Sequence, residues 1–368
     1  MHSLTHNEQV QLRDLGFQAD VFEGLVREFI AGRFPSNSVE GTVEAPEEGT
    51  ILPPPPIGTM QGDGIHDGGY QLLSQGRVGL VLLNGGMATR FGGRVKGVVD
   101  ALPGRSFLSL QAERLVTSLR ELGTAPALLV MNSNATDQAT RQHFEDHDYF
   151  GLPSDGVRFF TQSGAPRLRP DGTLYRDQEG AISIYGPGHG DLLPALRRTG
   201  SITWARERGV EVLLVANVDN LGATLDPQLL GMFAASGDEM MVEVVRKDKG
   251  DVGGCPAQVN GRMCIVEGFA FPEDFDQASI PVFNTNTLWF RTEAVDRELP
   301  LRWYAVKKQA HGDDVLQFEQ LVGQASWFLD TAWVEVPRER FLPVKSPADL
   351  EAVQARLRSM FGVRLEVL

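Results

Sequence analysis

Cysteine is scarce in this chain, because only Cys255 and Cys264 occur among its 368 residues. Two cysteines are too few for a disulfide framework or for a zinc site. The chain also lacks any run of eighteen apolar residues, and its first ten residues are polar, without the apolar core of an export signal. We therefore expect neither a membrane span nor export, and a location in the reducing cytoplasm.

The chain also has few basic residues relative to acidic ones. It contains 34 Lys and Arg residues and 48 Asp and Glu residues, which gives a net charge of -14. Nucleic acids and anionic membranes attract basic surfaces, so this balance argues against both as partners. Any polyphosphate ligand would have to be held by local cations, backbone amides or a metal. The length suits one large α/β domain with additions, or two domains.

The two common glycine-rich phosphate motifs are both missing from the loop that follows the apolar run 78–83. A Walker loop needs Gly-Lys-Ser or Gly-Lys-Thr, but Gly92 is followed by Gly93 and Arg94. Met87 stands where the dinucleotide fingerprint carries its second glycine. These differences argue against a P-loop NTPase and against a dehydrogenase.

The same loop nevertheless has the chemistry of a phosphate cradle. Gly85 and Gly86 leave backbone amides open to a ligand, and Arg90 and Lys96 add positive charge. The alternative is a loop whose glycines serve turn geometry only.

Hydrophobic periodicity predicts a mainly parallel sheet flanked by helices, which is an α/β fold. An amphipathic helix is expected near residues 20–30, with Asp20 as a possible cap, followed by a Pro-rich extended connection over 37–64. A second helix is expected over 107–122. The predicted strands cover residues 78–83, 127–131, 157–160, 210–218, 240–245 and 282–290.

Polar side chains follow several of these strands, at the strand ends where open α/β sheets bind ligands. Gln162 offers an amide that can pair with a base edge, and His189 lies among three glycines that permit close approach of a ligand. Asp219 follows an apolar strand, where a carboxylate could present Mg²⁺ to a phosphate. For each of these residues, a role as a turn or surface residue is the alternative.

Asn284 and Asn286 alternate along a predicted strand, so both amides would face one side and could bracket sugar hydroxyls. Two polar residues on a solvent-exposed face are the alternative. Lys345, near the end of the chain, could be a second phosphate-binding cation or an ordinary surface lysine.

Taken in order, several segments resemble the signatures of the UDP-sugar pyrophosphorylases, the family that contains the UTP–glucose-1-phosphate uridylyltransferases. They cover much of the chain between Leu83 and Leu350. The segments are LNGGMATRFGG with Lys96-Gly97, Gln162 to Arg167, Pro187 to Asp191, Asn217 to Thr224, Phe283 to Trp289 and Arg340 to Lys345.

The resemblance implies a Rossmann-like (GT-A-like) nucleotidyltransferase fold with a mixed, mainly parallel sheet. Residues 77–345 would form the catalytic domain, 1–76 a helical N-terminal region with a Pro-rich linker, and 346–368 a C-terminal helical tail. It also implies roles for individual residues: Leu83, Asn84, Gly85, Gly86, Gln162, Gly188, His189 and Asn217 on the nucleotide; Gly253, Gly254, Asn284 and Asn286 on the sugar; Lys96, Lys345 and Arg90 in catalysis; and Asp219 on Mg²⁺.

The implied reaction joins UTP and a sugar 1-phosphate, most often glucose 1-phosphate, into a UDP-sugar and pyrophosphate. Because the spacing of Lys96 from the glycines resembles the N-acetylhexosamine branch, an N-acetylhexosamine 1-phosphate or a range of sugar phosphates is the alternative substrate. A UDP-sugar sensor without turnover is the alternative outside catalysis.

The sequence departs from the family pattern in three places. Ala88 stands where relatives usually have glycine, and Val252 replaces a lysine before Gly253-Gly254. The chain also stops soon after Lys345, so the C-terminal β-helix that eukaryotic relatives use for self-association is not expected here.

Overall fold

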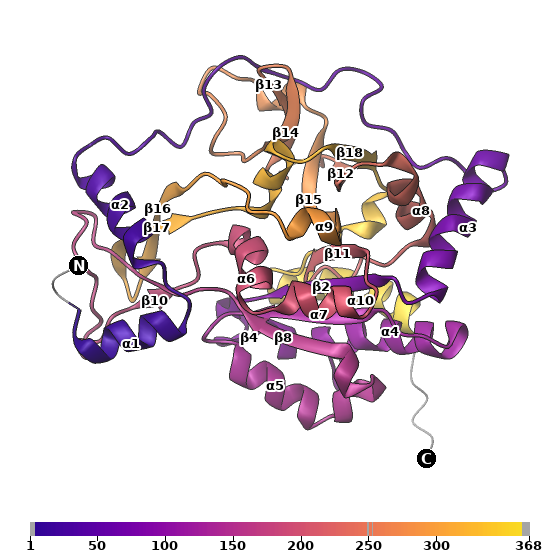
Figure 1. The fold of residues 1–368 in the computed structure, drawn as a ribbon, viewed down its shortest axis with the longest axis horizontal. Coiled ribbons are helices and arrows are strands. Elements are labelled where there is room, and N and C mark those ends of the chain that lie inside the picture. The colour runs from indigo at the N-terminus through magenta and orange to yellow at the C-terminus, as the bar shows by residue number, and fades with distance from the viewer. Residues whose placement is uncertain (1–3, 249, 252, 363–368) are drawn as a thin grey trace.

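A seven-stranded sheet forms the centre of the computed structural model, which describes residues 4–248, 250–251 and 253–362 (Figure 1). The strand order is β18-β12-β15-β11-β2-β7-β8. The six strands predicted from the sequence are confirmed, and β18 is an addition. Their bounds are β2 (Val78–Asn84), β7 (Ala127–Asn132), β8 (Val157–Thr161), β11 (Val212–Asn217), β12 (Met240–Arg246), β15 (Val282–Arg291) and β18 (Thr331–Glu335).

The sheet is mixed and mainly parallel, as predicted. Strands β2, β7, β8 and β11 run parallel, β18 runs parallel to β12, and β15 is antiparallel to both of its neighbours. β2 and β7 are buried along their whole length, which explains their unbroken apolar runs. The parallel strands also end in register, since Asn132 pairs with Asn84 and with Thr161, and Asn217 pairs with Leu83. The loops that follow them therefore leave one edge of the sheet.

Helices surround this sheet, and the predicted helix over 107–122 is confirmed as α4. Ser106 caps α4, because its hydroxyl accepts a hydrogen bond from the Ser109 N–H at 3.0 Å. The helices are α1 (His6–Asp14), α2 (Ala19–Ile30), α3 (Met60–Ser74), α4 (Phe107–Leu122), α5 (Asp137–Glu145), α6 (Leu192–Arg198), α7 (Ser201–Glu207), α8 (Pro227–Ser236), α9 (Thr292–Val295) and α10 (Pro347–Phe361).

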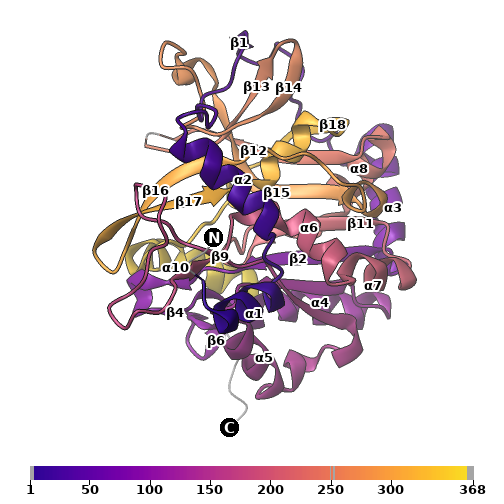
Figure 2. The ribbon, with the colours of Figure 1, turned by 60° about the vertical axis from the view of Figure 1, so that its left-hand side comes forward.

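Smaller sheets extend the central body. The longest hairpin, β16 with β17, lies beside α2 (Figure 2). The rings of Phe22 on α2 and Phe318 on β17 meet there edge to face, with their centroids 5.8 Å apart. The strands of these sheets are β1 (Val43–Glu44), β3 (Met87–Ala88), β4 (Arg94–Val95), β5 (Asp100–Leu102), β6 (Arg105–Ser106), β9 (Ala165–Pro166), β10 (Ile184–Tyr185), β13 (Cys255–Val259), β14 (Arg262–Val266), β16 (Tyr304–Ala310) and β17 (Asp313–Glu319).

The N-terminal region corrects two expectations. Helix α2 is present, but Gln18 occupies its N-cap position and makes no capping hydrogen bond, so the predicted cap at Asp20 is wrong. The connection expected to be extended as far as Gly64 ends earlier, because α3 begins at Met60.

Helix α3 packs closely on α8 through glycines. A Cβ atom at Gly69 would lie 1.8 Å from the carbonyl oxygen of Pro227, and a Cβ atom at Gly231 would lie 1.8 Å from that of Ile65. The helix is therefore stabilised by close backbone packing. It lacks the apolar stripe by which sequence analysis finds helices.

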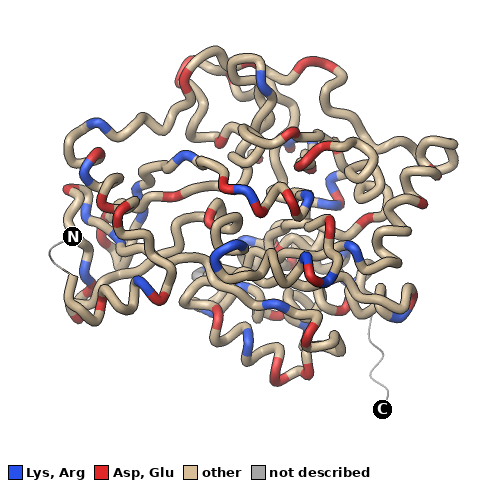
Figure 3. The backbone as a smooth tube through the Cα atoms, in the orientation of Figure 1, with Lys and Arg blue, Asp and Glu red and all other residues tan. Residues whose placement is uncertain are grey.

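Charged residues are interspersed over the part of the chain that the structure describes, with Lys and Arg scattered among Asp and Glu (Figure 3). No helix within the described residues has both the length and the apolar character needed to cross a membrane. The expectation that nucleic acid is not a partner stays a prediction.

Candidate active site

A cavity of about 560 Å³ opens where the loops leave the carboxyl edge of the sheet. Its size is typical of a small-molecule site. The loops after β2, β8, β10 and β11 form one part of its wall, and residues of β15, the glycines before β13, Glu267 and the segment 341–345 form the rest. Most residues predicted to bind substrates line it: Leu83, Gly85, Gly86, Lys96, Gln162, Gly188, His189, Asn217, Asp219, Gly253, Gly254, Asn284, Asn286 and Lys345.

An ion pair lies at the centre of this wall. The Lys96 Nζ atom is 2.5 Å from Oδ2 of Asp219, and their side chains are only 20% and 10% exposed. The same Oδ2 accepts a hydrogen bond from the backbone N–H of Val344 at 3.2 Å, which places the neighbouring Lys345 at the cavity. Two lysines and one aspartate from three distant parts of the chain therefore converge, as the sequence predicted.

Asn220 ties these parts of the chain together. Its side-chain oxygen accepts hydrogen bonds from the backbone N–H groups of Leu342 at 2.9 Å and Gly222 at 3.2 Å. Its side-chain nitrogen donates to the hydroxyl of Thr287 on β15 at 3.3 Å. One buried amide thus fixes the loop that carries Asp219 against the segment that carries Lys345.

A buried ion pair lies near this segment. The Arg340 guanidinium donates to both carboxylate oxygens of Glu243 at 2.7 and 2.8 Å, and the Trp289 indole N–H donates to the same carboxylate at 2.9 Å. Arg340 also donates to the Thr224 hydroxyl at 2.8 Å, and the side chains of Arg340 and Glu243 are 11% and 0% exposed. The pair anchors the residues before Lys345 to β12 and to the loop after β11.

Glycines surround the Gln162 side chain. A Cβ atom at Gly186 would lie 2.0 Å from the Gln162 side-chain nitrogen, and one at Gly85 would lie 2.9 Å from it. Gly188 has a φ of 85°, and a Cβ atom there would lie 2.2 Å from the Gln320 carbonyl oxygen. Side chains at these positions would displace Gln162 or the loop itself. Glycine is therefore required, because the backbone at these positions lies so close to Gln162 and Gln320 that no Cβ atom fits.

His189 is held as a neutral imidazole. The backbone N–H of Val322 donates to its Nδ1 atom at 3.0 Å, so Nδ1 carries no proton and Nε2 does. Burial lowers the pKa of His189 from 6.5 to about 4. The ring therefore remains neutral near pH 7 and offers the Nε2 N–H group as a hydrogen-bond donor.

This pKa predicts an acid sensitivity of folding. The unfolded chain takes up a proton at His189 near pH 6.5, whereas the folded chain does so only near pH 4, so this contribution to stability is complete above pH 6.5 and is lost as the pH falls toward 4. The loss amounts to about 3 kcal/mol. Urea unfolding of wild type and His189→Asn at several pH values measures it, because the stability advantage of the wild type should shrink by this amount between pH 7 and pH 4. If the stability difference between wild type and His189→Asn stays constant from pH 7 to pH 4, the predicted role of His189 in acid sensitivity is wrong.

Glu267 also lines the cavity, although nothing in the sequence around it marks it as a site residue. A Cβ atom at Gly254 would lie 3.1 Å from Oε2 of Glu267, so the carboxyl group lies against the predicted sugar-binding glycines. Burial raises the pKa of Glu267 from 4.5 to about 7. Near neutral pH its carboxyl group can both donate and accept hydrogen bonds, which suits a hydroxyl-bearing ligand.

The two asparagines of β15 both line the cavity, as predicted from their spacing, but the strand is not regular there. The pairing of β15 with β12 shifts register between Glu243 and Val244, and Asn286 has a φ of 58°. Within this irregularity the backbone N–H of Asn286 donates to the Asn284 side-chain oxygen at 2.9 Å. The side-chain nitrogen of Asn286 donates to the Asn217 side-chain oxygen at 3.2 Å. A bulge, rather than a regular strand, aims these amides at the cavity.

Two predicted residues do not line the cavity. The Asn84 side chain is buried, where its nitrogen donates to Asn132 and to Thr140, both at 2.8 Å, so it does not face the cavity, and the predicted contact of Asn84 with the nucleotide stays a prediction. Arg90 is exposed, with its guanidinium 3.5 Å from the Lys345 carbonyl oxygen. Two departures from the family pattern, Val252 and the Ala88 side chain, lie outside what the structure describes.

Asp219 belongs to no metal-sized cluster of three or more His, Cys, Asp or Glu side chains within the described residues. Both of its hydrogen-bonded contacts, from Lys96 and Val344, end on Oδ2. One carboxylate is compatible with Mg²⁺, which keeps several waters and takes oxygens from substrate phosphates as further ligands.

A family model described as UTP–glucose-1-phosphate uridylyltransferase matches residues 20–366. The relative with that name from Hordeum vulgare is 32% identical over 294 residues, covering 76% of this chain and 62% of the relative. The one from Astragalus penduliflorus is 30% identical over 358 residues, covering 91% of this chain and 73% of the relative. The one from Saccharomyces cerevisiae is 32% identical over 316 residues, covering 78% of this chain and 63% of the relative. The chain thus spans less than two thirds of the length of two of these three relatives.

Solved structures agree on the fold. A UDP-glucose phosphorylase from Trypanosoma brucei superimposes with a TM-score of 0.78 at 24% identity, covering 94% of this chain and 77% of that one. A putative UDP-N-acetylglucosamine pyrophosphorylase from Entamoeba histolytica gives a TM-score of 0.75 at 19% identity, covering 87% and 89%. The predicted nucleotidyltransferase fold is therefore confirmed.

Proposed function

The chain belongs to the family of UTP–glucose-1-phosphate uridylyltransferases, and from this premise we propose that it transfers the uridylyl group of UTP to glucose 1-phosphate. The products would be UDP-glucose and pyrophosphate. The observation that carries the proposal is the convergence of Lys96, Asp219 and Lys345 on one cavity. A site that only recognised a neutral sugar would not need two cations beside a carboxylate.

The proposed reaction needs no general base, because the attacking oxygen belongs to a phosphate that is already ionised near neutral pH. That oxygen would form a bond to the α-phosphorus of UTP while the bond from that phosphorus to the pyrophosphate oxygen breaks. The obstacle is repulsion between two anions, so catalysis consists of alignment and charge neutralisation. Lys96 and Lys345 would supply positive charge, and the amides of Gly85 and Gly86 would add dipoles.

The two ends of the cavity suit the two substrates. Gln162, next to Gly85 and Gly186, would pair with the uracil edge, and the Nε2 N–H of His189 would donate to the nucleotide. At the other end, Asn284, Asn286 and Glu267 would bind sugar hydroxyls.

Mg²⁺ is the proposed cofactor, and Asp219 would hold it. When bound, the ion would supply a charge that stabilises the phosphate oxygens. Lys96 is paired with Asp219, and we propose that its ammonium group would also contact the substrate phosphates. The cytoplasmic location expected from the sequence stays a prediction.

The alternative substrate is an N-acetylhexosamine 1-phosphate, favoured by the spacing of Lys96 from the glycines of the loop. Pyrophosphate release with each of the four NTPs against several sugar 1-phosphates tests the proposal. We expect the highest kcat/KM for UTP with glucose 1-phosphate. A higher kcat/KM for N-acetylglucosamine 1-phosphate would favour the alternative substrate. UDP-sugar binding without any pyrophosphate release would show that the protein is a UDP-sugar sensor and not an enzyme.

A further inference from the structure

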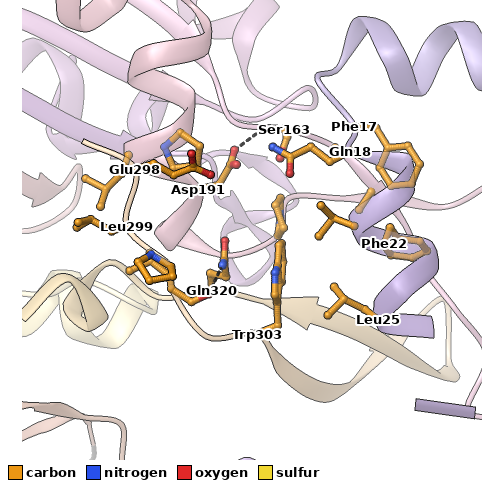
Figure 4. Close-up of a pocket in the computed structure, with 18 of the residues that line it drawn as sticks. Phe17, Gln18, Phe22, Leu25, Ser163, Asp191, Glu298, Leu299, Trp303 and Gln320 are labelled. Atoms are coloured by element: carbon orange, nitrogen blue, oxygen red, sulfur yellow. Dashed lines mark hydrogen bonds between the residues drawn. The ribbon is translucent and has the colours of Figure 1, made fainter. Parts of the chain in front are cut away.

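A second cavity, of about 250 Å³, lies between helix α2 and the body of the protein (Figure 4). One wall is apolar, with Phe22 and Leu25 on α2 and Trp303 opposite them. The other wall is polar and includes Ser163, Asp191 and Gln320. This cavity is distinct from the proposed substrate cavity, because the two share no lining residue.

The polar wall contains a buried carboxylate. The Asp191 side chain is 8% exposed, and its Oδ2 atom accepts a hydrogen bond from the Ser163 N–H at 2.5 Å. Two arginines are close, but the Arg197 guanidinium donates to the Val295 and Arg297 carbonyls at 2.9 and 2.7 Å, and Arg198 is 3.9 Å from Oδ2.

We propose that this cavity binds a compact, planar aromatic molecule that carries a protonated amine, and that its occupancy changes the affinity of the substrate cavity for nucleotide. The ring would lie between α2 and Trp303, where aromatic contact and burial favour it. The amine would donate to the Asp191 carboxylate, whose side chain is only 8% exposed, and the exposed Glu298 at the same cavity adds a second negative charge. The volume admits a single or fused ring and little more.

The coupling follows from loops that the two cavities share. Ser163 lines the second cavity, and its neighbour Gln162 lines the substrate cavity. Gln320 lines the second cavity, and its backbone holds the loop that carries His189 through hydrogen bonds of 2.8 Å to Gly190 and to Pro187. A ligand that contacts Ser163, Asp191 and Gln320 would therefore restrict the movement of the two loops that carry Gln162 and His189. This coupling rests on the proposed function, whereas the binding itself does not.

The binding is tested by calorimetric titration of the full chain with tryptamine, in the absence of nucleotide. Indole-3-acetate is the matched probe, because it has the same ring with the opposite charge. We expect tryptamine to bind with a Kd of about 1 mM or tighter and indole-3-acetate to bind at least about tenfold more weakly. Val21→Phe should weaken tryptamine binding about tenfold by filling the cavity, since Val21 lines it and is 41% exposed. Ile30→Phe, on the same helix but away from the cavity, should leave it unchanged.

Equal tryptamine binding by wild type and Val21→Phe, or equal binding of the two probes, would overturn the site. The coupling is tested by the Kd of UTP at saturating tryptamine, which should change by about threefold or more in the wild type and remain constant in Val21→Phe. Tryptamine binding with an unchanged UTP affinity would overturn the coupling. If UTP does not bind at all, the proposed function fails, while the tryptamine titration still decides whether the second site exists.

Discussion

Replacing Lys96 with methionine is expected to lower kcat by about a hundredfold or more, equivalent to about 3 kcal/mol of barrier. Methionine keeps the length and apolar stem of the side chain and removes only the ammonium group. That group lies 2.5 Å from Asp219 at the cavity where two anionic substrates would meet. Without it, their repulsion is less well neutralised, and the loss should appear in kcat because the charge is needed most in the transition state.

The measurement is steady-state pyrophosphate release at saturating UTP and glucose 1-phosphate. Lys307→Met is the matched control, because Lys307 is exposed on β16 and does not line the cavity. Circular dichroism checks that both variants fold. A Lys96→Met enzyme that folds and keeps a wild-type kcat would remove Lys96 from the catalytic machinery.

Truncating Glu243 to alanine is expected to lower the free energy of unfolding by about 3 to 5 kcal/mol. Glu243 is fully buried, and its carboxylate accepts hydrogen bonds from Arg340 and Trp289. Its loss would leave the Arg340 guanidinium, which is only 11% exposed, with the more distant and more exposed Asp226 carboxylate, 4.0 Å away, as its remaining counter-ion. A poorly compensated charge in the interior is far more costly than a lost surface ion pair.

Urea unfolding of Glu243→Ala, Arg340→Met and the double variant measures this effect. The double variant should be less destabilised than the sum of the two single variants, because it leaves no unpaired charge. Glu335→Ala is the control, since its ion pair with Arg246, which is 70% exposed, should contribute less than about 1 kcal/mol. Additive effects, or a loss for Glu243→Ala no larger than that for Glu335→Ala, would show that the buried pair does not anchor this segment.

The sequence predicted the elements whose signal is local. Strands such as β2 and β7 are apolar runs buried along their whole length, and α4 shows a regular apolar stripe after a capping serine. Because parallel strands end at one edge, the polar residues after β2, β8 and β11 could be expected to meet, and the structure brings Lys96, Gln162 and Asp219 to one cavity.

The remaining features depend on contacts between residues far apart in the sequence. In the sequence, Glu243 is a single polar residue within an apolar strand. Only the fold shows that its partner is Arg340, which lies 97 positions away. The buried orientation of Asn84 likewise depends on Asn132 and Thr140. Glu267 became a candidate only when the fold placed it against Gly254.

A crystal structure of the protein with Mg²⁺ and a non-hydrolysable UTP analogue is the decisive test of the proposed site. We expect uracil beside Gln162, the triphosphate between Lys96 and Lys345, and the metal on Asp219. A nucleotide bound away from these three charged side chains would contradict it.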